Sequence, residues 1–320
     1  EKLSAADKHR EFVVAVMKKL LEILISTEKS HEVELSIAKL FKELFLLPNH
    51  ISLTEISKDV AIELIKADSS ISQEVGGLLI KAKVDEWAES FTTGEIIKLS
   101  NNDILENRLA AREVFAKVAH RFSSETDSSQ KELAKAVALL DSKWEDSRKH
   151  WFEVFRSFSQ EVFTPAIVIA ICDSVREDVQ QFGREMIVRH FQEENGQEYL
   201  LKLSEHPSTD LQLFVTNYLE AYALNSPARL QHLKYYFISV LSRINKGRVA
   251  KTRVFRFLEM EAMKNQQAAE IVAEIVAWQS ATMTISDKAT AIEIMVKIAN
   301  TYPHITLPIS IQKPEVRHAV

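Results

Sequence analysis

The sequence predicts an all-α protein, built as a row of helical pairs in which each pair packs on the next. Glycine and proline, which favour turns, account for only 6 and 7 of the 320 residues, and most prolines fall between helical segments. Apolar residues recur every three or four positions along most of the chain, which is the spacing of one helix face. From 164 to 303 the pairs recur with a period of about 36–40 residues, which is typical of a helical solenoid.

The first half of the chain has less regularly spaced helices than the second. They are expected at 4–24, 33–44, 52–67, 72–89, 102–122, 131–140 and 144–158. Ser52-Leu53-Thr54-Glu55 has the form of a capping box, which begins a helix. Gly76-Gly77 interrupts the fourth helix. Because glycine weakens a helix, we expect a kink or a close helix crossing there.

Two segments before residue 164 have a distinctive composition. Ser123–Ser129 reads Ser-Ser-Glu-Thr-Asp-Ser-Ser, which predicts a mobile connection. The helix at 144–158 is rich in aromatic residues, which form either the core between helical pairs or a surface for a partner. These aromatic residues are Trp144, Trp151, Phe152, Phe155 and Phe158.

The second half divides into four helical pairs. Thr164-Pro165 and Ser226-Pro227 each place a capping hydroxyl before a proline, so each is expected to begin a pair. The expected helices are 166–171 with 175–191, 197–204 with 211–224, a pair opening at 226 whose inner helix runs from Gly247 to Lys264, and 268–279 with 287–300. Tyr302–Val320 alternates polar and apolar residues, which predicts an extended tail lying on the last repeat or reaching a partner.

The period is read from the apolar positions of the second helix of each pair. Val175 aligns with Leu211, and the next two apolar positions of each helix keep the same offset of 36. In the third pair Val249 lies 38 residues after Leu211. An offset that changes by only two residues is expected for repeats of one architecture.

This pattern resembles the HEAT/armadillo class of helical repeats. The resemblance rests on Asp173-Ser174-Val175-Arg176 at the start of an inner helix and on the apolar positions four and seven further on. It covers 164–303 and implies a right-handed superhelix whose second helices line a concave face. The expected organisation is 1–122 as irregular helical repeats, 123–163 as a connecting segment with the aromatic-rich helix, 164–303 as regular repeats, and 304–320 as the tail.

The bulk composition excludes several classes of protein. No run of 18 apolar residues predicts a membrane span, and Lys18-Lys19 and Glu22 interrupt any early apolar stretch that would read as a signal peptide. The single cysteine, Cys172, cannot form an internal disulfide, which favours a reducing, cytoplasmic location. Glu1 in place of an initiating methionine is consistent with a fragment or a processed protein.

The charge changes abruptly along the second half. Residues 161–222 contain four cationic and eleven acidic residues, whereas residues 223–258 contain eight Lys or Arg and no Asp or Glu. The eight cations are Arg229, Lys234, Arg243, Lys246, Arg248, Lys251, Arg253 and Arg256. The net charge of the whole chain is −5, so this basic stretch stands out from a mildly acidic background.

Helical geometry predicts that most of these cations share one exposed face. At about 100° per residue, Lys251 and Arg256 fall at about 300° and 80° from Arg248. The apolar residues at about 180–280° are Ala250, Val254, Phe257 and Leu258. Phe255, at about 340°, is expected among the cations. The predicted partner- or anion-binding residues are Arg243, Lys246, Arg248, Lys251, Arg253, Phe255 and Arg256.

Three interpretations of this basic face stay open at this stage. The cations form a solvated face that pairs with the acidic repeat before it, or they bind an acidic segment of a protein partner, or they bind nucleic acid. The net charge of −5 argues against nucleic acid as the main ligand, because it repels phosphate away from the patch. The favoured function is a scaffold or adaptor that binds a protein partner along its concave face, without a membrane or a small-molecule substrate.

Catalytic and cofactor-binding motifs are missing from the sequence. It contains no glycine-rich phosphate loop, no His-Glu-x-x-His pair, no cysteine cluster and no nucleophile elbow. We therefore predict no catalytic residues, no metal ligands and no cofactor. The HEAT-like DNA-alkylation-repair enzymes are the least favoured alternative, because the helix after Glu205-His206-Pro207-Ser208 lacks the basic residues of that group.

Overall fold

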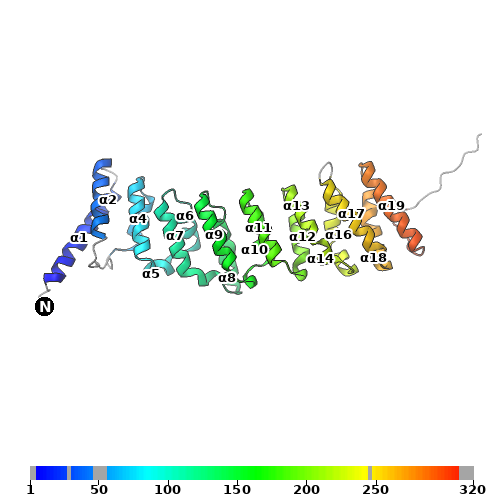
Figure 1. The fold of residues 1–320 in the computed structure, drawn as a ribbon, viewed down its shortest axis with the longest axis horizontal. Helices are drawn as coiled ribbons and strands as arrows, with labels where there is room; N and C mark the ends of the chain where they lie inside the picture. The colour runs from blue at the N-terminus through cyan, green and yellow to red at the C-terminus, as the bar shows by residue number, and fades with distance from the viewer. Residues whose placement is uncertain (1–4, 27–29, 46–55, 244–246, 310–320) are drawn as a thin grey trace, which may run out of the picture. The chain divides into compact units, whose positions relative to one another are not determined.

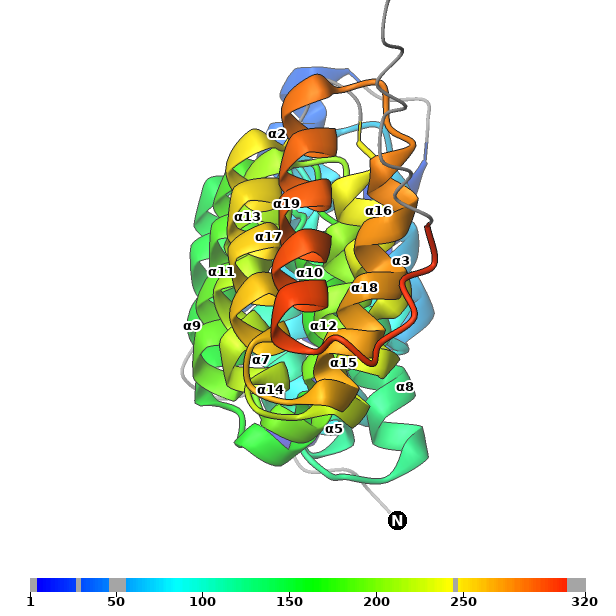
Figure 2. The ribbon, with the colours of Figure 1, turned by 90° about the vertical axis from the view of Figure 1, so that its right-hand side faces the viewer.

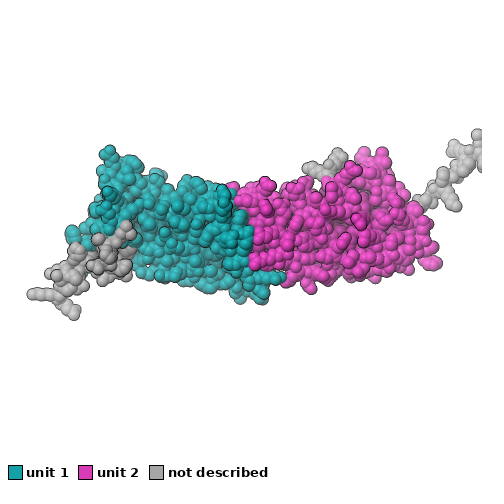
Figure 3. Space-filling view, viewed as in Figure 1, with its two compact units in different colours: residues 1–164 teal, residues 165–320 magenta. Residues whose placement is uncertain are grey.

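The computed structural model describes residues 5–26, 30–45, 56–243 and 247–309, with side chains from residue 11 onward. Over these residues the secondary structure is helical and includes no strand, so the all-α prediction is confirmed. The chain forms two compact units, Glu1–Thr164 and Pro165–Val320 (Figure 3). No helix in the described ranges has the length and apolarity needed to cross a membrane.

Unit 1 is a succession of antiparallel helices and short 3-10 turns. Its helices are α1 (Ala5–Ile25), α2 (His31–Phe45), α3 (Lys58–Lys66), α4 (Ser70–Ala82), α5 (Val84–Trp87), α6 (Thr93–Ser100), α7 (Leu105–Val118), α8 (Asp127–Ala136) and α9 (Glu145–Ser157). Helix α1 packs on α2 and α3, and α2 packs on α4. Helix α4 in turn packs on α7, and α6 packs on α7 and α8. Each pair therefore contacts the next one along the chain.

Unit 2 repeats this arrangement. Its helices are α10 (Pro165–Cys172), α11 (Glu177–His190), α12 (Gly196–Ser204), α13 (Thr209–Val215), α14 (Leu219–Ala223), α15 (Pro227–His232), α16 (Lys234–Leu241), α17 (Arg248–Ala262), α18 (Gln266–Ser280) and α19 (Ile285–Thr301). The first helices α10, α12, α16 and α18 contact one another in order, and so do the second helices α13, α17 and α19 (Figure 1). The two sets form two layers in the view along the row of helices (Figure 2).

The core lies between these two layers and is apolar. In unit 1 the side chains of Phe115, Trp151 and Phe155 are fully or almost fully buried, and Phe115 packs against the Trp151 ring with 5.1 Å between centroids. Trp151 and Phe155 of the predicted aromatic cluster therefore belong to the core, whereas Trp144, Phe152 and Phe158 are half-buried. Burial of such rings is the main contribution that stacked helices make to stability.

The turn between the two helices of a pair recurs with the same hydrogen bonds. In each turn, the side chain of a first residue accepts a hydrogen bond from the backbone N–H two residues later. The side chain of the residue six positions after the first residue donates a hydrogen bond to the first residue's backbone carbonyl. The first residues are Asn102, Ser142, Ser174 and His206, and the donors are Arg108, Arg148, Gln180 and Gln212. The first two turns lie in unit 1, where the sequence pattern was least regular.

These turns correct the alignment read from the sequence. Because Ser174 and His206 are equivalent, the offset between their helices is 32 rather than 36, and Val179 matches Leu211. Both are almost fully buried, whereas Val175 is 96% exposed. The error is four residues, about one helical turn. A shift of that size leaves the apolar face in place, so periodicity alone does not detect it.

Side chains also join neighbouring pairs. In unit 1 Arg108 bonds to Asp146, 38 residues away, and Lys143 bonds to Asp103, 40 residues away. In unit 2 Lys251 pairs with Asp287 and Lys297 with Glu259, at separations of 36 and 38. The sequence separation of these bonds matches the length of one helical pair.

Two local expectations needed correction, and a third, a kink or a close helix crossing at the two glycines, was confirmed as a close crossing. Helix α6 was not expected, although Thr92 and Glu95 form its capping box. Ser123–Ser129 is only partly a loop, since α8 begins at Asp127 and the Ser129 hydroxyl donates to the Arg121 carbonyl. The glycines at 76 and 77 do not break α4. They allow close crossings with α3 and α7, because an added Cβ would lie 2.8 Å from the Ala61 carbonyl and 2.9 Å from the Asn107 amide nitrogen.

One predicted helix divides, the described part of the predicted tail is non-helical, and two predicted segments lie outside the described ranges. The helix expected at 211–224 divides into α13, a 3-10 turn at Thr216–Tyr218, and α14. The capping box expected at 52–55 lies outside the described residues. The tail is non-helical from Tyr302 to Ile309, and its apolar residues Ile305, Leu307 and Ile309 are half-buried while Thr306 and Pro308 are exposed. Residues 310–320 lie outside the described ranges.

Candidate functional site

The basic stretch of unit 2 is centred on α17. Gly247 precedes this helix in the left-handed region, with φ of 73°, and an added Cβ there would meet nothing within 4 Å. The glycine is therefore explained by backbone conformation and not by packing. From Arg248 the helix runs to Ala262, contacting α16 and α18 on one side and α13 and α19 on the others.

Two predicted site residues are buried, contrary to expectation. Lys251 is 7% exposed and Phe255 is 5% exposed. The physical reason is that α17 lies between neighbouring second helices as well as against the first layer. Its buried arc is therefore wider than the apolar residues alone indicate, and it includes the positions at about 300° and 340°.

Lys251 is also neutralised within the fold. Its Nζ lies 2.6 Å from Oδ2 of Asp287, and both side chains are largely withdrawn from solvent, at 8% and 16% exposure. Asp287 stands in the first turn of α19. Lys251 is therefore part of the packing between α17 and α19, and it contributes little net charge to the surface.

Two further cations of the stretch are paired with carboxylates. Arg229 lies 3.1 Å from Glu193 of the preceding repeat, and Lys234 lies 2.6 Å from Glu274 of the following one. Pairing with the preceding acidic repeat was one of the three open interpretations. It holds for Arg229, whereas Lys234 and Lys251 pair with the following repeat.

Arg243 and Lys246 precede α17. Arg243 is half-buried and donates to neutral acceptors, the Gln212 side chain at 2.5 Å and the Ser204 carbonyl. Burial lowers the pKa of this guanidinium from its ordinary value, while nearby Tyr236 and Glu205 act in the opposite direction. Lys246 lies outside the described residues. Arg243 therefore acts as a tether between the turn and the preceding repeat.

Three arginines of α17 remain exposed. Within the described part of the chain, Arg248 and Arg256 have no ion pair or hydrogen bond from their side chains. Arg253 is exposed and donates to the Thr216 hydroxyl at 3.1 Å and to the Asn217 side chain at 2.7 Å, so its charge is not compensated by either partner. The predicted patch is thus smaller than expected, and its exposed charge comes from Arg248, Arg253 and Arg256.

A groove of about 810 Å³ lies between α17 and the start of α19. Arg248 and Arg256 line it together with the Lys251–Asp287 pair, and Phe255 contributes an apolar ring. Hydroxyl groups complete the lining: Thr252, Thr284, Ser286 and Thr290. Glu259, the other carboxylate in the lining, lies 2.7 Å from Lys297. Each carboxylate therefore has its own cation, and the charges of Arg248 and Arg256 remain available to a ligand.

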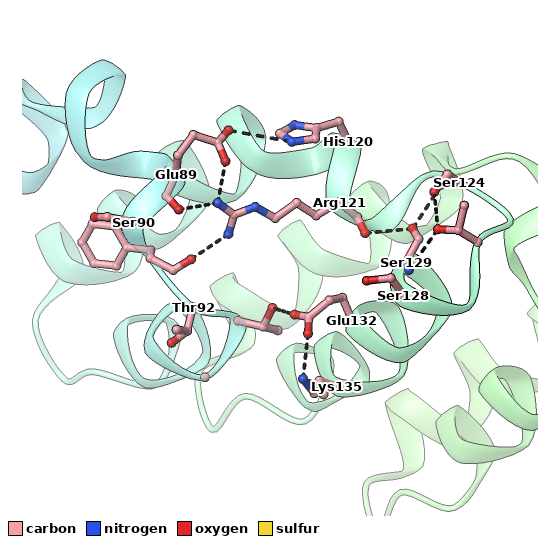
Figure 4. A pocket seen from close by; sticks show the side chains of 14 residues that line it. Glu89, Ser90, Thr92, His120, Arg121, Ser124, Ser128, Ser129, Glu132 and Lys135 are labelled. Atoms are coloured by element: carbon pink, nitrogen blue, oxygen red, sulfur yellow. Dashed lines mark hydrogen bonds and ion pairs between the residues drawn. The ribbon is translucent and has the colours of Figure 1, made fainter.

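Unit 1 contains a second hollow, of about 610 Å³, between the starts of α6 and α8 (Figure 4). Its Arg121 guanidinium is bound by the Phe91 and Glu89 carbonyls and by the Glu89 carboxylate. Glu132 accepts from Thr93 and Lys135. Because its charges largely satisfy one another, this hollow is a weaker candidate than the groove in unit 2.

Among the described residues, no cluster of three or more His, Cys, Asp or Glu side chains could hold a metal ion. Cys172 is buried, and burial raises the pKa of its thiol to about 12. A thiol with that pKa is almost entirely protonated near neutral pH, so it is a packing residue.

Comparisons of the chain with protein-family models, curated proteins and solved structures returned no match. The function is therefore inferred from the surface of unit 2.

Sequence reasoning missed the groove because it missed Asp287. The signal was present, since Asp287 lies one repeat length after Lys251, and Glu193 and Glu274 lie one length from their own cations. A search for carboxylates about 36–40 residues from each cation would have found these three partners.

Proposed function

We propose that this protein is a non-catalytic scaffold of the HEAT-like solenoid type, which acts in the cytoplasm and binds a protein partner through the second-helix surface of unit 2. The repeated turn and the side-chain bonds between neighbouring pairs support stacking of similar units. A right-handed superhelix would place α11, α13, α17 and α19 on its concave side, as the HEAT resemblance implies.

The observation that carries the proposal is the exposed arginine face of α17. Arg248, Arg253 and Arg256 present three guanidinium charges without carboxylate partners among the described residues. Val249 and Met260, 55% and 42% exposed, lie on the same helix. A surface that combines free guanidinium groups with exposed apolar side chains suits a partner that is acidic and partly apolar.

Nucleic acid is the alternative ligand, and the corrected geometry weakens it. Base stacking requires an exposed aromatic ring beside the cations, and Phe255 is buried. Phosphate binding gains from each free cation, and Lys251 is neutralised by Asp287. What remains is three arginines on a chain with a net charge of −5.

The test is affinity capture from a lysate of the source organism, with and without nuclease. We expect a protein partner that survives nuclease treatment and is lost with the triple variant R248E/R253E/R256E. The circular dichroism spectrum of that variant should match the parent, because the three side chains are exposed. Capture that depends on nucleic acid, or that is unchanged in the triple variant, would refute the proposal.

A further inference from the structure

The groove between α17 and α19 has the geometry of a slot for one short peptide segment. We propose that it binds an extended segment with the pattern acidic–x–apolar–x–acidic. This inference rests on the proposed scaffold function, and it assigns the part of the partner that the arginine face recognises.

The spacing of the two free guanidinium groups sets the length of the segment. Arg248 and Arg256 are eight residues apart on α17, which corresponds to about 12 Å along the helix axis. An extended peptide advances about 3.3 Å per residue. Two carboxylates four positions apart are therefore separated by about 13 Å, which matches the arginines.

The alternation of an extended chain sets the residue between the two acids. Side chains at positions 1, 3 and 5 of such a segment point to the same side. If residues 1 and 5 face the arginines, residue 3 faces the centre of the groove. There the lining contains Thr252, with its methyl group, and Phe255. A leucine-sized side chain at position 3 gains apolar contact, whereas a charged one would lie over the Lys251–Asp287 pair without a free counterion.

The residues next in sequence to the groove lining favour the same chemistry. Met283 and Ile285 flank Thr284, which lines the groove, and they are 93% and 84% exposed. Apolar side chains this exposed gain from being covered by a partner. Charge complementarity then selects an acidic segment, because Arg248 and Arg256 line the groove without a carboxylate partner among the described residues.

Fluorescence anisotropy with defined peptides tests the proposal. The probe is fluorescein-labelled Gly-Ser-Glu-Ser-Leu-Ser-Glu-Ser-Gly, titrated with the full chain at low salt. We expect saturable binding by the parent protein. The dissociation constant should rise about threefold to tenfold in R248E and by a similar factor in R256E, because each variant replaces one attraction to a peptide carboxylate with a repulsion. The matched control is K202E on α12, which reverses the charge of an exposed side chain in the same unit and lies outside the groove lining. It should change the dissociation constant less than twofold.

Three further probes test the pattern. Replacement of the leucine by serine, replacement of both glutamates by glutamine, and placement of the glutamates side by side should each weaken binding about tenfold. T252E, which puts a carboxylate between the arginines, should abolish binding while the circular dichroism spectrum stays unchanged.

Several results would overturn the slot. They are an absence of saturable peptide binding by a folded protein, a K202E effect equal to that of R248E, and affinity that stays the same when the leucine is replaced by serine. Tighter binding of a fluorescein-labelled nine-nucleotide single-stranded DNA would assign the groove to nucleic acid instead. If the peptide fails while nuclease-resistant capture still depends on the arginines, the scaffold function stands and only the slot is lost.

Discussion

The ion pair between Lys251 and Asp287 allows a quantitative test of how α17 and α19 are joined. The variant D287N removes the negative charge and keeps the shape, which leaves the Lys251 ammonium buried without a counterion. Breaking a buried pair in this way typically costs about 3–5 kcal/mol. Asp287 retains 16% exposure, so we expect the lower end, about 3 kcal/mol.

The assay is thermal unfolding of the full chain, and the quantity measured is the Tm of the transition in which unit 2 unfolds. Trp278 on α18 is the one tryptophan in the sequence after residue 164, and its fluorescence in a variant with W87F, W144F and W151F reports on that unit. For a unit of about 150 residues, 1 kcal/mol corresponds to about 2–4 °C in Tm. D287N should therefore lower this Tm by about 6–12 °C in the same background.

A double-mutant cycle and a matched pair complete the test. K251M/D287N removes both charges, and it should cost less than the sum of the single variants because no buried charge is left unpaired. The control is E259Q, which breaks the exposed Lys297–Glu259 pair between the same two helices and should cost less than about 1 kcal/mol. If D287N costs no more than E259Q, or if the double variant is additive, the buried pair does not hold α17 to α19.

Three further predictions follow from local structure. Because burial raises the pKa of Cys172 to about 12, its thiol should stay unreactive in the native protein at pH 8 and react on unfolding. Burial of the protonated thiol contributes stability that is complete below about pH 9, the ordinary pKa of the group, and that is lost as the pH rises toward 12. Denaturation at several pH values measures this loss. G77A should destabilise by more than about 1 kcal/mol, since its Cβ would lie 2.9 Å from the Asn107 amide nitrogen, whereas G94A, with open space, should be neutral or stabilising. Q180A, which removes the side-chain donor to the Ser174 carbonyl, should cost about 1 kcal/mol by urea titration.

Most helices were predictable because their determinants are local. Capping residues before prolines located the starts of α10 and α15, and apolar spacing located α1, α2, α7, α9, α17, α18 and α19 to within a few residues. The capping box of α6 at Thr92 and Glu95 was readable in the same way, although it was overlooked.

The repeat register was not predictable from apolar periodicity. A shift of one helical turn preserves the apolar face, so offsets of 32 and 36 look alike in the sequence. The hydrogen bonds of the turns at Ser174 and His206 decide between them, because they fix which residue begins each second helix.

The sequence by itself determined that this chain is helical, that its pairs repeat, and that residues 223–258 carry cations without carboxylates. Only the tertiary structure decided which of those cations face a ligand. The reason is that burial on α17 depends on helices about one repeat away. Asp287 on α19 neutralises Lys251, while Arg248 and Arg256 have no counterion among the described residues. A helical projection contains the neighbours on the same helix, and it does not contain the counterion that packing brings from the next one.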